Sequence, residues 1–467
     1  DGFLILVDGH LVIITKKGSL HVAQATPKGY AEIARVALFE DLAWSHPSFA
    51  DGRIYVRSLG ELARIDIRSG AAPMASAKEM DKRLAASRFG RFLAEVATAD
   101  DKKAVVDRFI ESQREFPLIE GDDRLHFIYR GPAEDLAVAG DLFGARQERA
   151  MTRVAGTDLF YHTARLEPDA RVNYLFIKDY EEITDPRNPR KTTTTVFTKE
   201  MEMSFSGEAM EMSWVSMPKW RTPRFLDESV AASPGRIDTQ ELESKLLETK
   251  HTIDVYLPAG YDESEQRYPV AYVHGGKAAR ELGKLPAALD HLIGTEVAPL
   301  IVVFIHAQPR GGPGKYPDMF TEELVPFIDE TYRTVASAEA RANVGTGFAG
   351  FAAMLCTFHK PGLVKNVGCQ SAFIFDSMMP ALEKAIPTAE TMPVTMYLDW
   401  GKYDLRNPHE AWDLSESNRK FARFLRDKGY TYVGGEVHDG TGWSSWRNRT
   451  DALFGTLFPP TSKQKPS

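Results

Sequence analysis

A β-rich run turns into a helical run at Val344-Gly345-Thr346-Gly347-Phe348-Ala349-Gly350-Phe351-Ala352-Ala353. Other apolar β-rich runs lie on either side of this turn, separated by helical stretches: 270–273, 300–305, 342–344, 367–369 and 394–398. Such alternation is typical of a largely parallel sheet with helices on both faces. The sequence therefore predicts an α/β domain over residues 251–460.

Several landmarks follow one another in a fixed order around this turn. They are Thr252-Ile253-Asp254-Val255-Tyr256-Leu257-Pro258, Tyr268-Pro269-Val270, His274-Gly275-Gly276 and Glu322-Glu323-Leu324-Val325-Pro326-Phe327-Ile328-Asp329. In this order they resemble the putative-esterase family that contains enterochelin, feruloyl and S-formylglutathione esterases. The resemblance implies an α/β-hydrolase fold with a serine, a histidine and a carboxylate for acyl transfer.

The nucleophile of that fold stands on a strained turn of the form G-x-S-x-G. Here Gly347 takes the place of the serine, and no serine occurs between Ser337 and Ser371. A slip of one residue would offer Thr346, but its side chain would leave the apex of the turn. A β-branched residue also tolerates positive φ poorly. The sequence therefore predicts that the nucleophile position is vacant.

The other two triad positions lie further along the chain. Asp404 matches the acid of the family, with a solvated loop aspartate as the alternative. The family's histidine shortly precedes a Trp-x-x-Trp, and ungapped counting back from Trp443 puts Thr441 in its place. His438 is the alternative base, provided that the loop contains a compensating insertion and deletion. On this interpretation two of the three catalytic groups are missing.

His274-Gly275-Gly276 is the counterpart of the oxyanion-hole loop, whose small residues let a backbone N–H approach a developing oxyanion. A tight turn after a buried strand would also favour these glycines. No metal or cofactor is predicted, because the possible ligands share no recognised spacing: His274, His306, His438 and Asp404.

The segment 118–222 has short β-rich runs with turn residues between them, at 125–129, 136–141, 159–163 and 171–177, which predicts an immunoglobulin-like β-sandwich. Its turn Asp185-Pro186-Arg187-Asn188-Pro189 resembles the early-set sandwich of enterochelin esterases, which is related to glycogen-binding modules. The family commonly has a tryptophan where this chain has Ala145. Without that ring to stack on a sugar, glycan binding by the sandwich is in doubt.

Residues 1–72 contain a repeat, since Asp8-Gly9-His10-Leu11-Val12-Ile13 recurs 43 positions later as Asp51-Gly52-Arg53-Ile54-Tyr55-Val56. The period and strand character resemble the last blades of a quinoprotein-type β-propeller, and a pair of plain hairpins is the alternative. A propeller needs at least ~4 blades. This predicts further blades in the same protein or pairing with another chain.

The remaining segments are predicted as a helical connector (73–117), a linker (223–250) and a tail (461–467). The chain of 467 residues has 43% hydrophobic and 26% charged residues and a net charge of -8, as globular proteins do. No long block of Lys and Arg indicates nucleic-acid binding, and no apolar run predicts a transmembrane segment.

Three functional hypotheses follow. The main one is a pseudo-esterase that binds a small-molecule ester, siderophore or glycan, or that is a structural part of a larger exported bacterial protein, periplasmic or extracellular by analogy. The second is an active carboxylic-ester hydrolase that uses His438 and Asp404 with an unrecognised nucleophile. The third places the function in missing blades that bind a quinone or metal.

Overall fold

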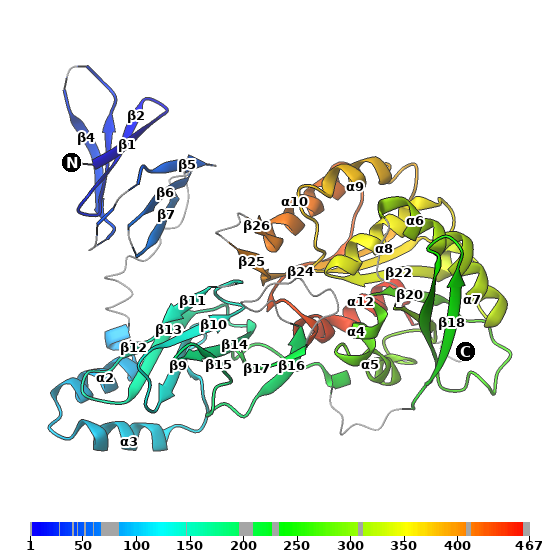
Figure 1. The fold of residues 1–467 in the computed structure, drawn as a ribbon, viewed down its shortest axis with the longest axis horizontal. Helices are drawn as coiled ribbons and strands as arrows, with labels where there is room; N and C mark the ends of the chain where they lie inside the picture. The colour runs from blue at the N-terminus through cyan, green and yellow to red at the C-terminus, as the bar shows by residue number, and fades with distance from the viewer. Residues whose placement is uncertain are drawn as a thin grey trace, which may run out of the picture. The chain divides into compact units, whose positions relative to one another are not determined.

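The structure is a computed structural model, and its chain forms two compact units, residues 1–87 and 88–467 (Figure 1). It describes residues 2–66 except 28, 40, 41, 44, 51, 52 and 59, and then 84–145, 147–195, 209–226, 233–306, 312–407 and 412–460. The predicted tail and part of the predicted connector lie outside these residues. Each unit is described by itself.

The N-terminal unit consists of two antiparallel sheets. One has the order β1-β2-β3-β4 (Gly2–Val7, His10–Thr15, Ser19–Gln24, Ala31–Ala37), and the other β5-β6-β7 (Ser48–Ala50, Arg53–Arg57, Leu62–Asp66). Both copies of the repeat form the same hairpin, β2-β3 in the first and β6-β7 in the second. A propeller blade and a plain hairpin pair share this arrangement, so the propeller remains a prediction.

The C-terminal unit begins with two helices. Two antiparallel sheets follow, and their facing side chains form a common core. The helices are α2 (Arg88–Thr98) and α3 (Lys102–Ser112), and the sheets are β11-β10-β14-β17-β16, with β15 beside β14, and β12-β13-β9-β8. The strands run from β8 to β17 as follows: Leu118–Glu120, Arg124–Arg130, Leu136–Gly140, Glu148–Ala150, Thr152–Arg153, Leu159–Arg165, Arg171–Lys178, Glu181–Ile183, Lys191–Thr195 and Ala209–Ser216. The four β-rich runs expected here are β9, β10, β13 and β14.

Two features of this region explain sequence patterns. Phe89 of α2 packs on His126 and Tyr161, with ring centroids 4.5 and 5.2 Å away, so the predicted connector helices cover the four-stranded sheet. In the turn 185–189, the buried Asp185 carboxylate accepts a hydrogen bond of 2.7 Å from Tyr174, and the Asn188 amide donates one of 3.0 Å to the same hydroxyl. These hydrogen bonds hold the turn against the core between the two sheets. We call this two-sheet region, residues 118–216, the sandwich.

The α/β region is built on an eight-stranded sheet with the order β18-β19-β21-β20-β22-β23-β24-β27, and β25 and β26 form a separate two-stranded sheet. In this spatial order the strands from β21 to β27 run parallel to one another. The strands β18 and β19 form an antiparallel edge. The bounds in this spatial order are Arg236–Ser244, Thr249–Leu257, Ile301–Ile305, Val270–His274, Arg341–Thr346, Asn366–Gln370, Thr395–Tyr403 and Val433–Gly440. This is the mostly parallel sheet that the alternating pattern predicts.

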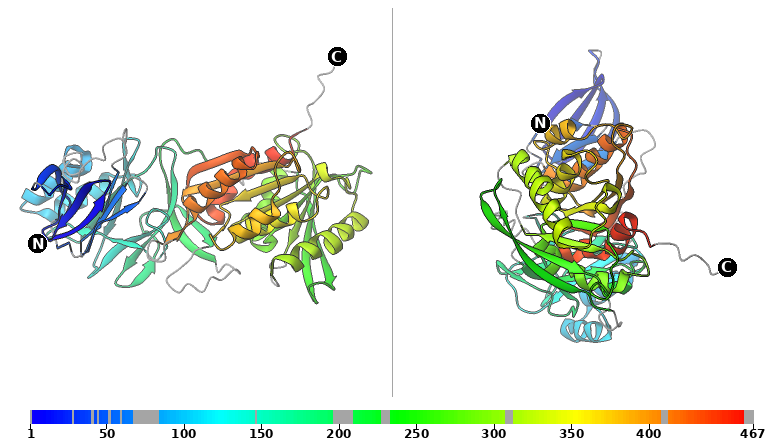
Figure 2. Two further views of the ribbon diagram at one scale, coloured as in Figure 1. Left: turned by 90° about the horizontal axis from the view of Figure 1, so that it is seen from above. Right: turned by 90° about the vertical axis from the view of Figure 1, so that its right-hand side faces the viewer.

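Helices cover both faces of this sheet (Figures 1 and 2). On one face pack α4 (Gly276–Glu281), α5 (Leu285–Leu292) and α12 (Thr450–Leu457). On the other pack α6 (Gly312–Met319), α7 (Val325–Thr331), α8 (Phe348–His359), α9 (Met379–Ala385) and α10 (Leu414–Asp427). Short elements complete the region: η1 (Arg224–Leu226), η2 (Phe320–Leu324), η3 (Ala338–Ala340), β25 (Arg406–Asn407), β26 (Trp412–Asp413), α11 (Trp443–Trp446) and η4 (Arg447–Arg449).

The segment 223–250 is not only a linker, as the sequence suggested, because it contains β18. This strand pairs with β19 along its whole length, from Arg236↔Leu257 to Ser244↔Thr249. Its sequence RIDTQELES is mostly polar, because an edge strand has one side open to solvent and needs few apolar residues. Apolar periodicity therefore missed it.

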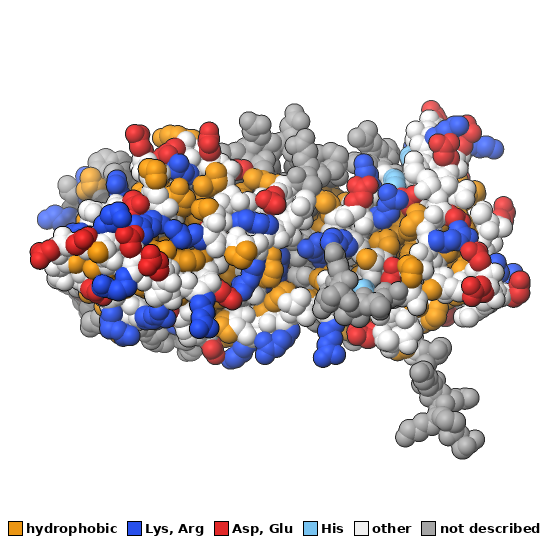
Figure 3. All heavy atoms as spheres, turned by 90° about the horizontal axis from the view of Figure 1, so that it is seen from below, with side chains coloured by type: hydrophobic (Ala, Val, Ile, Leu, Met, Phe, Trp, Pro, Cys, Tyr) orange, Lys and Arg blue, Asp and Glu red, His pale blue; other side chains and the backbone are white. Residues whose placement is uncertain are grey.

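Figure 3 shows basic and acidic side chains interspersed on the face that it displays, rather than gathered by sign. Within the described residues, no helix is both long enough and apolar enough to cross a bilayer.

Candidate functional site

The strand-to-helix turn keeps a strained backbone without a side chain at its apex. Gly347 separates β22 from α8 with φ 55° and ψ −126°, a conformation that favours glycine. Its N–H donates to the Gln370 carbonyl at 3.0 Å, and its carbonyl accepts from the Phe373 N–H at 2.9 Å. A Cβ at Gly345 would lie 2.1 Å from the Ala349 carbonyl oxygen, so the strand and the helix meet too closely for a side chain there.

Aromatic rings lie over the place where a nucleophile would stand. A Cβ at position 347 would be 3.5 Å from the Trp446 ring and 3.7 Å from the Phe373 ring, which is ordinary van der Waals contact. Gly347 and both of these residues are buried. Phe348 stands edge-on to Phe373 with ring centroids 4.6 Å apart. A serine side chain would therefore fit at this position, in contact with both rings.

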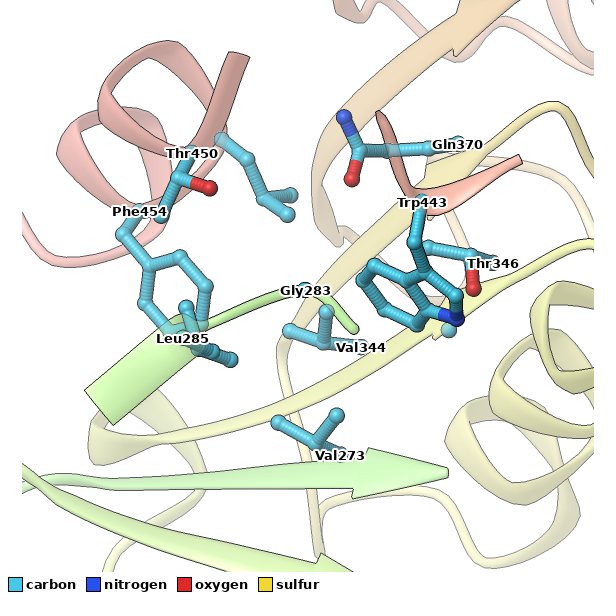
Figure 4. Close-up of a pocket in the computed structure, with 11 residues that line it drawn as sticks. Val273, Gly283, Leu285, Val344, Thr346, Gln370, Trp443, Thr450 and Phe454 are labelled. Carbon is cyan, nitrogen blue, oxygen red and sulfur yellow. The ribbon is translucent and has the colours of Figure 1, made fainter. Parts of the chain in front are cut away.

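Thr346, the alternative hydroxyl, lies beside Trp443 among the residues that line a cavity (Figure 4). This cavity is on the α5 and α12 side of the sheet. Apart from Thr346, Gln370 and Thr450, its lining side chains are apolar: Val273, Leu285, Val344, Trp443, Leu453 and Phe454. Thr346 therefore does not occupy the apex of the turn.

Asp404 follows β24 and is fully buried. Its Oδ1 accepts a hydrogen bond of 2.9 Å from the Thr441 hydroxyl, and its Oδ2 accepts one of 2.9 Å from the Gly401 N–H. Burial raises the pKa of this carboxyl to about 7, although its hydrogen bonds favour the charged form. The sequence left open that Asp404 is a solvated loop residue, and its complete burial contradicts that alternative.

Thr441 stands where a triad would need its base. Its hydroxyl donates to Asp404 and also accepts the Leu405 N–H at 2.6 Å, so it bridges the carboxyl and the backbone of the acid loop. We define the acid loop as residues 401–406. A threonine hydroxyl cannot take up a proton at neutral pH as an imidazole does, so this contact provides no general base.

His438 lies on β27 and faces the sandwich. Its Nδ1 is 2.6 Å from Asp169 Oδ1, and both side chains are partly exposed. The Asp404 carboxylate instead accepts a hydrogen bond from the Thr441 hydroxyl. The geometry therefore does not bring His438 and Asp404 together as acid and base.

The loop 274–276 is the counterpart of the oxyanion-hole loop. Its glycines pack closely against neighbouring residues, and Gly275 lies next to the strand-to-helix turn. A Cβ on Gly275, which has φ 71°, would be 3.2 Å from the Ala349 side chain, and one on Gly276 would be 2.5 Å from the Ile305 nitrogen. His274 is buried, 2.8 Å from the Tyr316 hydroxyl and 3.0 Å from Asn343 Oδ1, and burial lowers its pKa to about 4. The glycines shape the loop, and the imidazole belongs to the core.

The candidate metal ligands do not converge. His306 lies 3.0 Å from Asp254, which also binds Arg280, whereas His274, His438 and Asp404 have the separate partners given above. Among the described residues, no group of three or more His, Cys, Asp or Glu side chains is placed to hold a metal ion.

Sequence reasoning missed an ionic network beside the acid loop. Arg449 binds Asp399 through Nε at 2.8 Å and Asp439 through Nη1 at 3.0 Å. Arg171, from strand β14 of the sandwich, is 3.3 Å from the Ser445 hydroxyl and 3.8 Å from Asp439. These residues are far apart in the sequence and form no local pattern.

A single segment, residues 167–171, contacts both the acid loop and β27. Glu167 binds Lys402 and Tyr403 of the acid loop, and Asp169 binds His438. The buried Ala145 donates its N–H to the Arg406 carbonyl at 2.8 Å. Ala145, which the sequence predicts to replace the family's tryptophan, therefore contacts the acid loop.

The sheet, its flanking helices and the strained turn define an α/β-hydrolase-type domain. Residues 244–457 match the model of the protein family described as Putative esterase. This match over the C-terminal domain confirms the resemblance predicted from the ordered landmarks.

Two curated relatives and two solved structures are similar to the chain. An endo-1,4-beta-xylanase/feruloyl esterase of Xylanibacter ruminicola is 27% identical over 245 residues, 48% of this chain and only 31% of that protein. The uncharacterized protein YjcH of Bacillus subtilis is 22% identical over 231 residues, 47% of this chain and 95% of that protein.

The structures extend the likeness to most of the chain. Ferric enterobactin esterase of Salmonella typhimurium has a TM-score of 0.59 at 16% identity, over 75% of this chain and 98% of that one. Enterochelin esterase of Shigella flexneri has a TM-score of 0.55 at 17% identity, over 75% and 97%. At these identities the likeness establishes a shared fold.

Proposed function

We propose that this chain is a catalytically degenerate esterase, whose function is binding or structural within a larger exported protein. The observation that carries the proposal is the bond from Thr441 to Asp404, because it occupies the acid where a working triad needs imidazole. The absence of a side chain at Gly347 supports the same conclusion.

The active-hydrolase hypothesis requires His438 at the acid. Its contact with Asp169 argues against that role, and Thr346, the alternative hydroxyl, is among the residues that line the cavity. The ligand classes that we propose are a small-molecule ester, a siderophore or a glycan. Siderophore esters are favoured by the likeness to the enterobactin esterases, which share the fold over 75% of the chain.

Hydrolysis of short-chain p-nitrophenyl esters tests the proposal. We expect the purified wild-type chain to show no turnover above buffer and no labelling by a fluorophosphonate, because no activated nucleophile is present. The double variant Gly347→Ser, Thr441→His is expected to gain labelling at position 347, since a Cβ there meets only ordinary contacts. Its matched control is Gly347→Ala, Thr441→His, which lacks the new hydroxyl.

Turnover by the wild type at rates ordinary for esterases would overturn the proposal, and the labelled residue would then identify the true nucleophile. In that case His438→Gln would show whether this imidazole is the base. The wild-type measurement is decisive even if the double variant remains inert.

A further inference from the structure

Asp404 is a buried carboxyl that contacts only neutral donors. Its hydrogen bonds come from the Thr441 hydroxyl and the Gly401 N–H, and the Ser371 hydroxyl is a further neutral neighbour. Among the described residues, no Lys, Arg or His forms an ion pair with it. A buried carboxylate without a cationic partner costs several kcal/mol, which protonation removes.

The charged groups around Asp404 leave an excess of negative charge. Arg449 is the nearest cation, but Asp399 and Asp439 already bind it. Asp141 follows β10, accepts the Asn173 N–H at 2.7 Å and packs against Gly440, where a Cβ would be 2.0 Å from its carboxyl. The neighbourhood thus holds four carboxyls and two guanidinium groups: Asp141, Asp399, Asp404 and Asp439, with Arg171 and Arg449. At its rim are the pairs Glu167–Lys402 and Asp169–His438.

The loop that carries Asp404 is also the part of the hydrolase region on which the sandwich rests. Lys402 and Tyr403 bind Glu167, and the Tyr403 ring is buried in the sandwich core. Arg406 donates to the Leu142 carbonyl at 2.5 Å and accepts the Ala145 N–H through its own carbonyl at 2.8 Å. A change of charge at Asp404 therefore acts directly on the junction between the two domains.

We propose that Asp404, a buried acid without a basic partner, is a proton-binding site that couples pH to the docking of the sandwich on the acid loop. In the protonated state the carboxyl and the Thr441 hydroxyl exchange donor roles and no net charge is buried. Loss of the proton puts an uncompensated charge inside the junction and loosens residues 401–406. The inference rests on the contacts of this loop and does not require that the chain be inactive toward esters.

The direction of the pH dependence follows from the raised pKa. The ordinary value of this carboxyl is 3.8 and the folded value is about 7, so between these pH values the folded chain holds a proton that the unfolded chain has released. The stability of the junction is therefore greatest at the acid end of this interval and falls as pH rises toward about 7. Above that pH the free-energy cost of the buried charge no longer changes with pH.

Hydrogen exchange of the full chain at about pH 6 and about pH 8, corrected for intrinsic rates, tests the proposal. For a group with a folded pKa near 7, the protection of residues 401–406 should fall about tenfold across this range relative to that of β21. In Asp404→Asn we expect this fall to disappear. The matched control is His438→Gln, in which it should persist. Asp141→Asn is not a suitable control, because burial raises the pKa of Asp141 to about 7 as well.

The proposal is overturned if Asp404→Asn keeps the tenfold fall, or if the fall disappears in His438→Gln instead. Thr441→Val provides a second test in case Asp404→Asn fails to fold. It removes a donor that favours the charged carboxyl, so the midpoint of the pH dependence should move upward. An unchanged midpoint would contradict the assignment of the proton to Asp404.

Discussion

Replacing Arg449 by methionine is expected to lower the free energy of unfolding of the C-terminal unit by about 3–5 kcal/mol, because it leaves buried carboxylates unpaired. The guanidinium binds Asp399 through Nε at 2.8 Å and Nη2 at 3.2 Å, and Asp439 through Nη1 at 3.0 Å. Asp399 is fully buried and Asp439 nearly so. Urea unfolding followed by tryptophan fluorescence would measure the loss.

A surface arginine provides the control for this measurement. Arg423 on α10 pairs with Glu416 at 3.2 Å, but the two side chains are 53% and 45% exposed. Arg423→Met should therefore change the free energy of unfolding by no more than about 0.5 kcal/mol. Equal effects of the two substitutions would mean that the network does not stabilise the region. Adding Asp399→Asn to Arg449→Met should recover part of the loss, since it removes one of the unpaired charges.

The central sheet was predictable because its strands are buried on both faces. The β-rich runs at 270–273, 300–305, 342–344, 367–369 and 394–398 correspond to β20, β21, β22, β23 and β24. The two outer strands, β18 and β27, were not predictable from apolar periodicity. β18 is mostly polar, and the sequence of β27, VGGEVHDG, contains few apolar residues. Apolar periodicity reports burial, and strands at the edges of a sheet have less of it.

The site was predictable where backbone geometry demands a residue type. The glycines of the turn 344–353 marked the strained passage from β22 to α8, and counting from Trp443 pointed to Thr441, which the structure places on Asp404. The junction with the sandwich gave no such signal. Its contacts join Arg171 to Ser445 and Asp169 to His438, pairs that only the folded chain brings together.

The turn itself yields the second prediction with a large effect: Gly345→Ala should destabilise the C-terminal unit by about 3 kcal/mol or more. The added Cβ would lie 2.1 Å from the Ala349 carbonyl oxygen and 2.6 Å from the Gly350 nitrogen, and these backbone atoms cannot move without separating α8 from β22. Thermal and urea unfolding of the variant would measure the loss.

Gly347→Ala is the matched comparison, because it adds the same methyl group two residues later in the same turn. There the nearest atom is in the Trp446 ring at 3.5 Å, so the cost comes only from φ 55° and should be about 1–2 kcal/mol. If alanine were tolerated better at 345 than at 347, the turn would not have the close strand-to-helix approach described above. If the expected order holds, the turn retains the backbone of a nucleophile elbow for reasons of packing.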